Sequence, residues 1–228
     1  MKKIHLALLF IFVTSGLLAQ DINQFDANGQ RHGKWKKNFE NTKVVRYEGE
    51  FDHGKEIGTF KFYKNIDGKA VLTATKVFNK DTNEAYVTFL ASTGKKISEG
   101  KMLGRDYIGK WVIYHKNADQ VMTEEYYNDK GKLEGERKVY YLSGQVAEKA
   151  YYKNGLLDGE STWYTENGNL IKIITYKADK FHGAYKTYNK EGLIATEGQY
   201  RDDVKCCVWK RYKDGVLVEE KDLDKKRQ

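Results

Sequence analysis

A repeated glycine-to-tyrosine spacing constrains this chain more than any other feature. A glycine or its substitute recurs at Gly109, Gly135, Gly159, Gly183 and Cys207. A tyrosine follows each at one fixed offset: Tyr114, Tyr140, Tyr164, Tyr188 and Tyr212. We call the first site of each unit the glycine position. Self-similarity at a period of about 25 residues predicts an array of repeats in which each unit completes its neighbour.

The same register extends toward the N-terminus with some decay. Gly33 and Gly58 occupy the glycine position of two earlier units, and Glu84 occupies that of a degenerate third. The chain therefore holds about eight units of about 25 residues, the last one truncated. Few long linkers interrupt them, so we predict one repeat domain over residues 20–222.

Each unit is typical of a β-hairpin. The whole chain contains 0 prolines, which fits many paired strands because proline removes a backbone donor. Asn-Gly and related pairs, as at Asn154-Gly155 and Asn167-Gly168, separate runs rich in Tyr, Thr and Val. The predicted fold class is all-β: an elongated antiparallel β-hairpin array.

Tyrosines fall on both strands of the predicted hairpins. The five named above lie on first strands, and Tyr127, Tyr152, Tyr176 and Tyr200 close second strands. Equivalent residues of adjacent hairpins should line one face in columns, where rings can stack. One unit alone cannot offset its ordering entropy, so we interpret these aromatic residues chiefly as packing between units.

The N-terminus is typical of a secretory signal peptide. Lys2 and Lys3 precede the apolar run of residues 6–13, which ends in small residues with cleavage expected near Ala19. The run is too short for a membrane anchor, which needs about 20 apolar residues. Because no cysteine lies near the cleavage site, we predict a Sec-type signal over residues 1–19, not a lipoprotein, and a periplasmic or secreted mature protein.

The charge pattern argues against nucleic acid as a partner. The net charge is +8, and it falls to +6 when Lys2 and Lys3 are removed with the signal peptide. Charges of both signs are spread along the array, which leaves only mild attraction to an anionic membrane or glycan. The charged C-terminal tail, residues 223–228, is expected to fray or to serve as a polar cap.

No motif of enzyme chemistry stands out, and we predict no catalytic, cofactor-binding or metal site. Nucleophile elbows, P-loops and dinucleotide fingerprints are absent from the sequence. His32, His53 and His182 each precede a glycine at predicted turns, and His115 ends a predicted strand. No two share a spacing typical of metal ligands, so solvated turn histidines are expected.

Cys206 and Cys207 are the chain's 2 cysteines and are adjacent. In an oxidising compartment a pair suggests a disulfide. Adjacent residues of a strand alternate faces, so we expect free thiols, or a disulfide-linked dimer through Cys206 or Cys207. A strained bridge between the two remains the alternative.

Taken together, the repeated glycines, paired tyrosines and Asn-Gly turns over residues 26–222 resemble the bacterial variant of the MORN repeat, known as the YwqK-type antitoxin family. The likeness is clearest over residues 104–200. Glu84 and Cys207 depart from it at glycine positions, and Arg137 and Ser161 depart where Trp or Tyr is usual. The resemblance implies an elongated β array used for protein or membrane contact, without a catalytic centre.

These features favour a non-enzymatic binding or scaffold module of the cell envelope with a protein partner. The first alternative is binding to cell wall or polysaccharide, because exposed Trp and Tyr rings stack on sugars. The second is an antitoxin or immunity-type protein that neutralises a toxin, which rests on the family name alone. The sequence does not indicate which face of the sheet would bind.

Overall fold

The computed structural model describes residues 21–225 and consists of strands and turns. The predicted signal peptide and the last three residues of the charged tail lie outside this range. The strands are β1 (Gln24–Phe25), β2 (Arg31–Asn38), β3 (Val45–Asp52), β4 (Lys55–Ile66), β5 (Lys69–Phe78), β6 (Glu84–Leu90), β7 (Lys96–Leu103), β8 (Asp106–Tyr114), β9 (Val121–Tyr127), β10 (Gly135–Tyr140), β11 (Val146–Lys153), β12 (Leu156–Leu157), β13 (Gly159–Tyr164), β14 (Leu170–Lys177), β15 (Lys180–Tyr188), β16 (Ile194–Arg201), β17 (Val204–Lys213) and β18 (Val216–Asp222).

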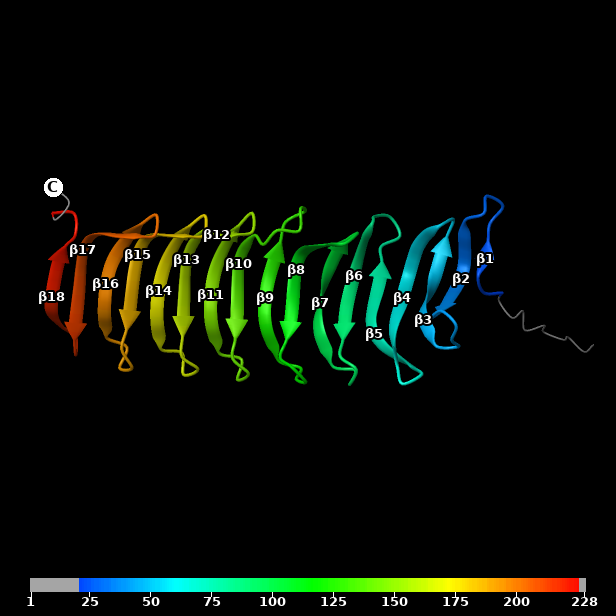
Figure 1. The fold of residues 1–228 in the computed structure, drawn as a ribbon, viewed down its shortest axis with the longest axis horizontal. Coiled ribbons are helices and arrows are strands. Elements are labelled where there is room, and N and C mark those ends of the chain that lie inside the picture. The colour runs from blue at the N-terminus through cyan, green and yellow to red at the C-terminus, as the bar shows by residue number, and fades with distance from the viewer. Residues whose placement is uncertain (1–20, 226–228) are drawn as a thin grey trace, which may run out of the picture.

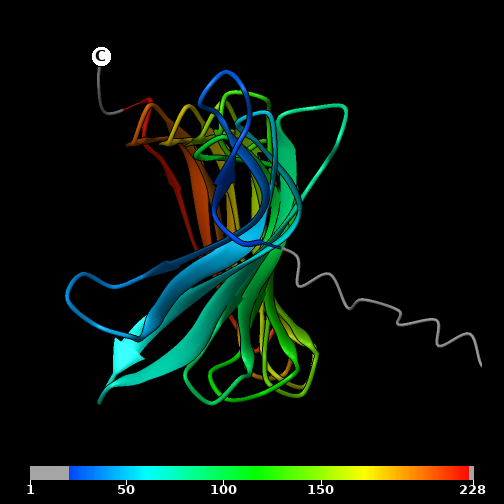
Figure 2. The ribbon, with the colours of Figure 1, turned by 90° about the vertical axis from the view of Figure 1, so that its right-hand side faces the viewer.

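The strands form one open antiparallel sheet in chain order (Figure 1). Each strand pairs with the next, except that the short β12 pairs with β11, which also pairs with β13. Figure 2, along the long axis, shows the strands rotating progressively from one end to the other, the usual twist of a sheet. The predicted elongated β-hairpin array is confirmed. Among residues 21–225, no helix has the length and apolar character needed to cross a membrane.

The glycine position is a site of left-handed backbone. Gly109 has a φ of 61° and Gly135 a φ of 80°, which glycine adopts without steric cost. At Gly109 the register between β7 and β8 shifts, so the strand bulges there. Cys207 has the same geometry with a φ of 62°, although it carries a side chain. Glu84, by contrast, lies in regular register opposite Leu103.

A second register shift lies directly before the repeated tyrosine. It falls between Ile113 and Tyr114 on β8, and between Val139 and Tyr140 on β10. The later units repeat it before Tyr164, Tyr188 and Tyr212. The tyrosine spacing in the sequence therefore corresponds to a recurring β-bulge.

One side of the sheet, which we call the inner face, holds most of the buried side chains. Val87 and Ala150 are 0% exposed and Trp111 is 1% exposed. A single sheet has no second layer over either face, so these residues are covered by large side chains of the same sheet, as where Tyr107 stacks on Trp111 at 3.8 Å. Ala85, Val87, Met102 and Trp111 form one core cluster, with Tyr107 and Tyr127 packed against it.

Large rings on the inner face lie over glycines of the preceding strand. A Cβ atom added to Gly100 would lie 2.6 Å from the Trp111 ring, and one added to Gly198 would lie 2.3 Å from Trp209. The indole N–H of Trp111 then donates to the Lys101 carbonyl at 2.7 Å. These glycines are needed for space and not for their φ angle.

The tyrosines lie on the predicted strands, but those of the first strands and those of the second strands make different contacts. The second-strand set packs ring against ring on the inner face: Tyr127 lies 5.5 Å from Tyr107, and Tyr200 lies 5.3 Å from Trp209. First-strand tyrosines point to the opposite side, which we call the outer face. There Tyr114 and three equivalents donate hydrogen bonds to glutamates instead of stacking on one another. The expected ring columns therefore describe the inner face only.

The charged run near the C-terminus is more ordered than its composition indicates. Glu219 and Glu220 belong to β18 and pair with β17, and Arg211 contacts Glu219 at 2.9 Å. This strand is the last of the array, and its charged side chains are consistent with the predicted polar cap.

Candidate binding surface

The outer face carries a carboxylate cluster in several units, and Glu99 on β7 is the centre of one. Lys96 donates to both of its oxygens at 2.8 and 2.9 Å, and Tyr114 of the next strand donates a short hydrogen bond. Burial opposes ionisation of Glu99, but these donors outweigh it, and its pKa lies below the ordinary value. Glu99 is therefore an anion whose charge is held by residues of two strands.

Glu124 on β9 repeats the arrangement one unit later. Lys110 donates to it at 2.5 Å and Tyr140 at 2.9 Å, and the hydrogen bond from Lys110 is the main cause that lowers the pKa of Glu124. A similar tyrosine–glutamate pair joins β10 and β11, where Tyr151 donates to Glu136 at 3.3 Å. Each cluster joins one strand to a neighbour across the outer face.

Two further clusters lie toward the ends of the array. Tyr63 donates to Glu48 at 2.6 Å, and Tyr212 donates to Glu197 at 2.7 Å. Burial, followed by the bond to Glu48, raises the pKa of Tyr63 to about 12. Between them the series of tyrosine–glutamate pairs is interrupted at Tyr164 and Tyr188, because the corresponding places on the preceding strands hold Lys149 and Ile173 instead of glutamate.

Exposed aromatic residues lie between these charged clusters. Tyr86, Tyr126 and Tyr151 are 46%, 43% and 43% exposed on the outer face, and the exposed Val77 lies directly across from Tyr86. Tyrosine is enriched where proteins meet, because its ring buries area and its hydroxyl keeps a hydrogen-bonding group. We refer to these three tyrosines with the Glu99 and Glu124 clusters as the tyrosine row.

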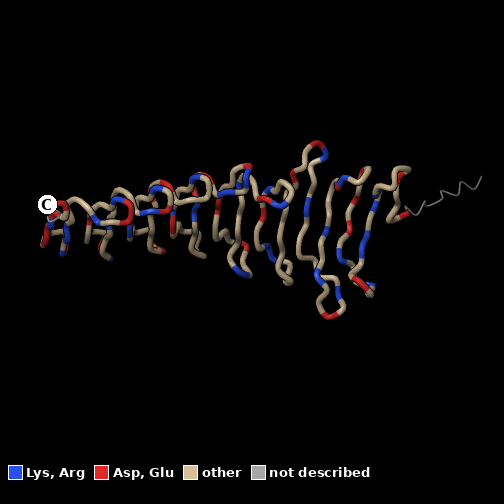
Figure 3. The backbone as a smooth tube through the Cα atoms, turned by 45° about the horizontal axis from the view of Figure 1, so that its top comes forward, with Lys and Arg blue, Asp and Glu red and all other residues tan. Residues whose placement is uncertain are grey.

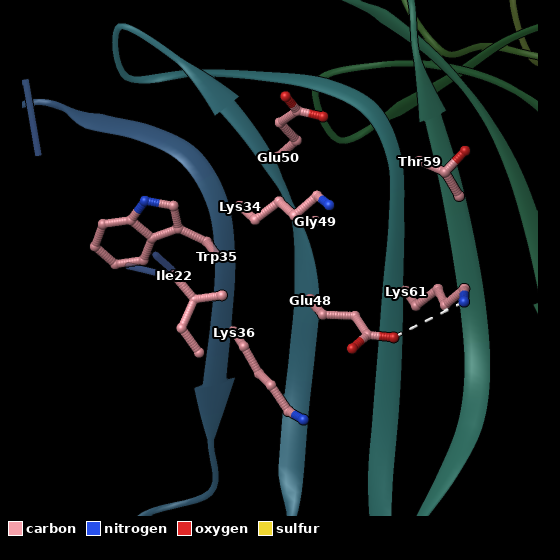
Figure 4. A pocket seen from close by; sticks show the side chains of 9 residues that line it. All are labelled: Ile22, Lys34, Trp35, Lys36, Glu48, Gly49, Glu50, Thr59 and Lys61. Atoms are coloured by element: carbon pink, nitrogen blue, oxygen red, sulfur yellow. Dashed lines mark ion pairs between the residues drawn. The ribbon is translucent and has the colours of Figure 1, made fainter. Parts of the chain in front are cut away.

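A shallow hollow of about 320 Å³ lies at the N-terminal end of the array (Figure 4). Its walls are Lys34, Lys36, Glu48 and Lys61 with backbone at Gly49, and Lys61 pairs with Glu48 at 3.8 Å. Figure 3 shows both signs of charge interleaved along the whole array. The described surface therefore has local charge pairs and no continuous basic stripe.

Glu125 brings a buried charge into the mostly apolar packing of the inner face. Glu125 is buried, accepts a 2.6 Å hydrogen bond from Tyr127 and lies 3.4 Å from Nε of Arg137. Arg137 is one of the residues that depart from the usual aromatic position, and an ion pair replaces the ring there. At the other departure, Ser161 is buried, as is the small Ala150 of β11. The two departures therefore change which side chains pack on the inner face and leave the strand pairing intact.

The tryptophans are used mainly inside the array. Trp111 is fully buried, and Trp35 and Trp209 donate their indole N–H groups to backbone carbonyls of Gln24 and Cys206 at 3.1 Å. Lys172 lies over the ring of Trp163, 3.9 Å from its centroid. Lys172 therefore covers a face of Trp163 on which a sugar would stack, and the indole N–H groups of Trp35 and Trp209 are already hydrogen-bonded within the array.

His53 lies in a turn and His115 directly follows β8, as expected, but the turn prediction is wrong for His32 and His182, which lie near the starts of β2 and β15. Two of these histidines also meet. The rings of His32 and His53 are 4.7 Å apart because the start of β2 pairs with the end of β3, next to the β3–β4 turn that holds His53. His182 is far along the chain beside Asp202 at 3.3 Å, and His115 contacts the Tyr140 carbonyl at 3.1 Å. His32 and His53 are 21 residues apart in the chain, a separation that matches no local metal motif.

Cys206 and Cys207 do not follow the alternation of a regular strand. The left-handed backbone at Cys207 turns its sulfur toward that of Cys206, to 2.9 Å, and both are free thiols. The hydrogen bond to Cys206 is the main cause that raises the pKa of Cys207 to about 11. Pairing with another chain stays a prediction.

The tyrosine–glutamate pairs of the outer face were not predicted, although a sequence signal for them exists. Tyr63, Tyr114, Tyr140 and Tyr212 each follow a glutamate at nearly the same separation, namely Glu48, Glu99, Glu124 and Glu197. Read with the hairpin register, this spacing places the two side chains on neighbouring strands and on one face. The clusters consist of carboxylates whose charge is already paired, an arrangement suited to recognition at a surface.

Fold and surface together define an open β-hairpin repeat protein with a long, chemically mixed outer face. The model of the MORN repeat variant matches residues 133–154 and 157–178, two successive hairpins between Leu133 and Ala178. This match supports a MORN-repeat family for the chain. A comparison with curated proteins finds no match.

Proposed function

We propose that this chain is an exported, non-enzymatic binding or scaffold module that holds a protein partner of the cell envelope against its tyrosine row. The inner face is occupied by its own side chains, so the outer face is the surface left for a partner. A MORN repeat is compatible with such a binding module. Export rests on the predicted signal peptide in residues 1–19.

The observation that carries this proposal is the exposure of Tyr86, Tyr126 and Tyr151 between prearranged ion pairs. A tyrosine held on a strand loses little conformational freedom on binding, since it has only two side-chain torsions. Partner residues can also meet charges whose orientation is already fixed, as in the Glu124 cluster, which favours specificity.

Site-directed photo-crosslinking in the native envelope tests the proposal. A crosslinking residue replaces Tyr126 or Tyr151 in separate variants, and a matched control carries it at Leu142, another exposed apolar residue, at a turn. We expect a defined protein adduct from both row positions and none from the control. Equal labelling from all three positions, or none from the row, would refute a binding role for the outer face.

Polysaccharide binding is a second candidate, favoured by a hollow of about 280 Å³ beside Trp209 near the C-terminal end. Thr196, Lys210 and Arg211 line it with hydrogen-bond donors, and Lys205 lies over the indole at 4.1 Å. A glycan that enters should displace Lys205 and change the tryptophan emission. Titration with soluble wall fragments that leaves the emission unchanged would exclude this candidate.

An antitoxin role is a special case of protein binding in which the partner is a toxin. Its test is co-expression with the product of a neighbouring gene, scored for rescue of growth. Rescue that is lost when Tyr126 and Tyr151 are replaced by Ala, and kept in Leu142→Ala, would assign the toxin to the tyrosine row.

A further inference from the structure

Two histidines and one aspartate meet at the N-terminal edge of the array, at the end of β3 and the start of β2. The ligand atoms offered by His32, Asp52 and His53 all lie within 4.8 Å of one another. The Asp52 carboxylate oxygen is 3.6 Å from Nδ1 of His32 and 3.8 Å from Nε2 of His53. In a tetrahedral zinc site with bonds of about 2.0–2.1 Å, ligand atoms lie about 3.4 Å apart. The three atoms need to move only slightly to enclose one ion.

A fourth residue fixes the orientation of His53. Asp26 accepts from Nδ1 of His53 at 2.6 Å, so that Nε2 faces Asp52 and His32. The other oxygen of Asp26 accepts backbone N–H groups of Asn28 and Gln30 at 2.9 and 2.8 Å, and its side chain is 7% exposed. A carboxylate that holds the outer nitrogen of a histidine is the usual support of a metal-binding imidazole.

The backbone also positions these ligands. His53 has a φ of 45° in the turn between β3 and β4, and Gly54 after it donates to the Arg31 carbonyl at 2.8 Å. The His53 N–H donates weakly to Nδ1 of His32 at 3.4 Å, and a metal ion would replace this bond with a stronger one. All three ligand residues are open to solvent, so water could reach the remaining coordination position of an ion held there.

We propose that His32, Asp52 and His53 form a binding site for a divalent transition ion of the zinc class, supported by Asp26. Two imidazoles and one carboxylate suit such ions better than Ca²⁺ or Mg²⁺, which prefer oxygen ligands. The bound ion joins the start of β2 to the β3–β4 turn and so caps the N-terminal end of the array. This role is independent of any partner on the outer face.

The chain contains its own control at the other end. His182 and Asp202 lie at the same place in a later unit, separated along the chain as His32 and Asp52 are, and their side chains are 3.3 Å apart. Asp203 stands there where the first site has His53. His182→Ala therefore removes a matched histidine from the start of β15 without touching the proposed site.

Isothermal titration of the full protein, purified without a polyhistidine tag, with ZnCl₂ tests the site. We expect one ion per chain, an affinity lowered at least about 100-fold in His32→Ala and His53→Ala, and lowered about 10–100-fold in Asp26→Asn. Co²⁺ in place of Zn²⁺ should give the visible absorption of a tetrahedral site. His182→Ala should bind like the unmodified protein.

Thermal unfolding keeps the test decisive if a variant folds poorly. Zinc should raise the midpoint of the unmodified protein and of His182→Ala, and leave that of His32→Gln unchanged, with folding of each variant checked by circular dichroism. No stoichiometric binding to the unmodified protein would overturn the proposal. Equal loss of binding in His182→Ala would overturn the location.

Discussion

The contact between Gly100 and Trp111 allows a sharp test of how the array is packed. In Gly100→Ala the new Cβ would lie 2.6 Å from the indole, where about 3.4 Å is the closest ordinary approach. Because Trp111 is 1% exposed, the ring has no free space into which it can move. Overpacking of this kind costs about 1–3 kcal/mol.

A displaced ring also strains the hydrogen bond from the indole N–H to the Lys101 carbonyl, which contributes about 1 kcal/mol. The substitution should therefore lower the free energy of unfolding by about 2–4 kcal/mol. For a protein of this size each kcal/mol lowers the midpoint by about 2–4 °C. Thermal and urea unfolding followed by circular dichroism measure both quantities.

The array provides the compensating exchange. Two repeats further along the chain, Ala150 and Ser161 occupy the positions that correspond to Gly100 and Trp111, and both are buried. In the background of Trp111→Ser, or of Trp111→Leu if serine prevents folding, Gly100→Ala should cost almost nothing. A cost in that background as large as in the unmodified protein would refute the steric reasoning.

Three single residues allow further tests. Cys207→Gly should raise the stability by about 1 kcal/mol in urea unfolding, because a non-glycine residue at a φ of 62° is strained. Glu125→Ala should lower it by about 3 kcal/mol, since it leaves Arg137 and a tyrosine hydroxyl without their acceptor. In an NMR titration the pKa of His53 should lie above 6.5, chiefly because of its hydrogen bond to Asp26, and should fall in Asp26→Asn.

Each of these has its own contradicting result. Unchanged or lower stability of Cys207→Gly would mean that the thiol contact with Cys206 outweighs the strain. A cost for Glu125→Ala plus Arg137→Ala equal to the sum of the single changes would show that the two do not interact.

The contribution of the His53–Asp26 pair to the free energy of unfolding depends on the charge of both groups. This contribution is lost as pH rises through the raised pKa of His53, and as pH falls through the lowered pKa of Asp26. It is therefore fully present between the ordinary pKa values of the two side chains, 3.8 and 6.5. Maximal stabilisation outside that interval would contradict the pairing.

The repeat period was enough to predict the sheet, because glycine and tyrosine mark its two recurring bulges. It was not enough to predict which side each tyrosine faces. That depends on register shifts, as at Tyr114, which move a side chain relative to its neighbours. The meeting of His32 and His53 was also hidden, since they become neighbours only through the pairing of the start of β2 with the end of β3. Cys207 at a glycine position signalled strain, but the approach of the two sulfurs needed the actual backbone angle.

The sequential pairing of β2 to β18 has a consequence for how such a protein can change. Every hairpin bonds to those just before and after it in the chain, so removing one whole unit brings together two edges that already have matching bulges. The molecule therefore behaves as a ruler: its length is set by the number of repeats and can be altered in steps of about 25 residues without redesigning the rest.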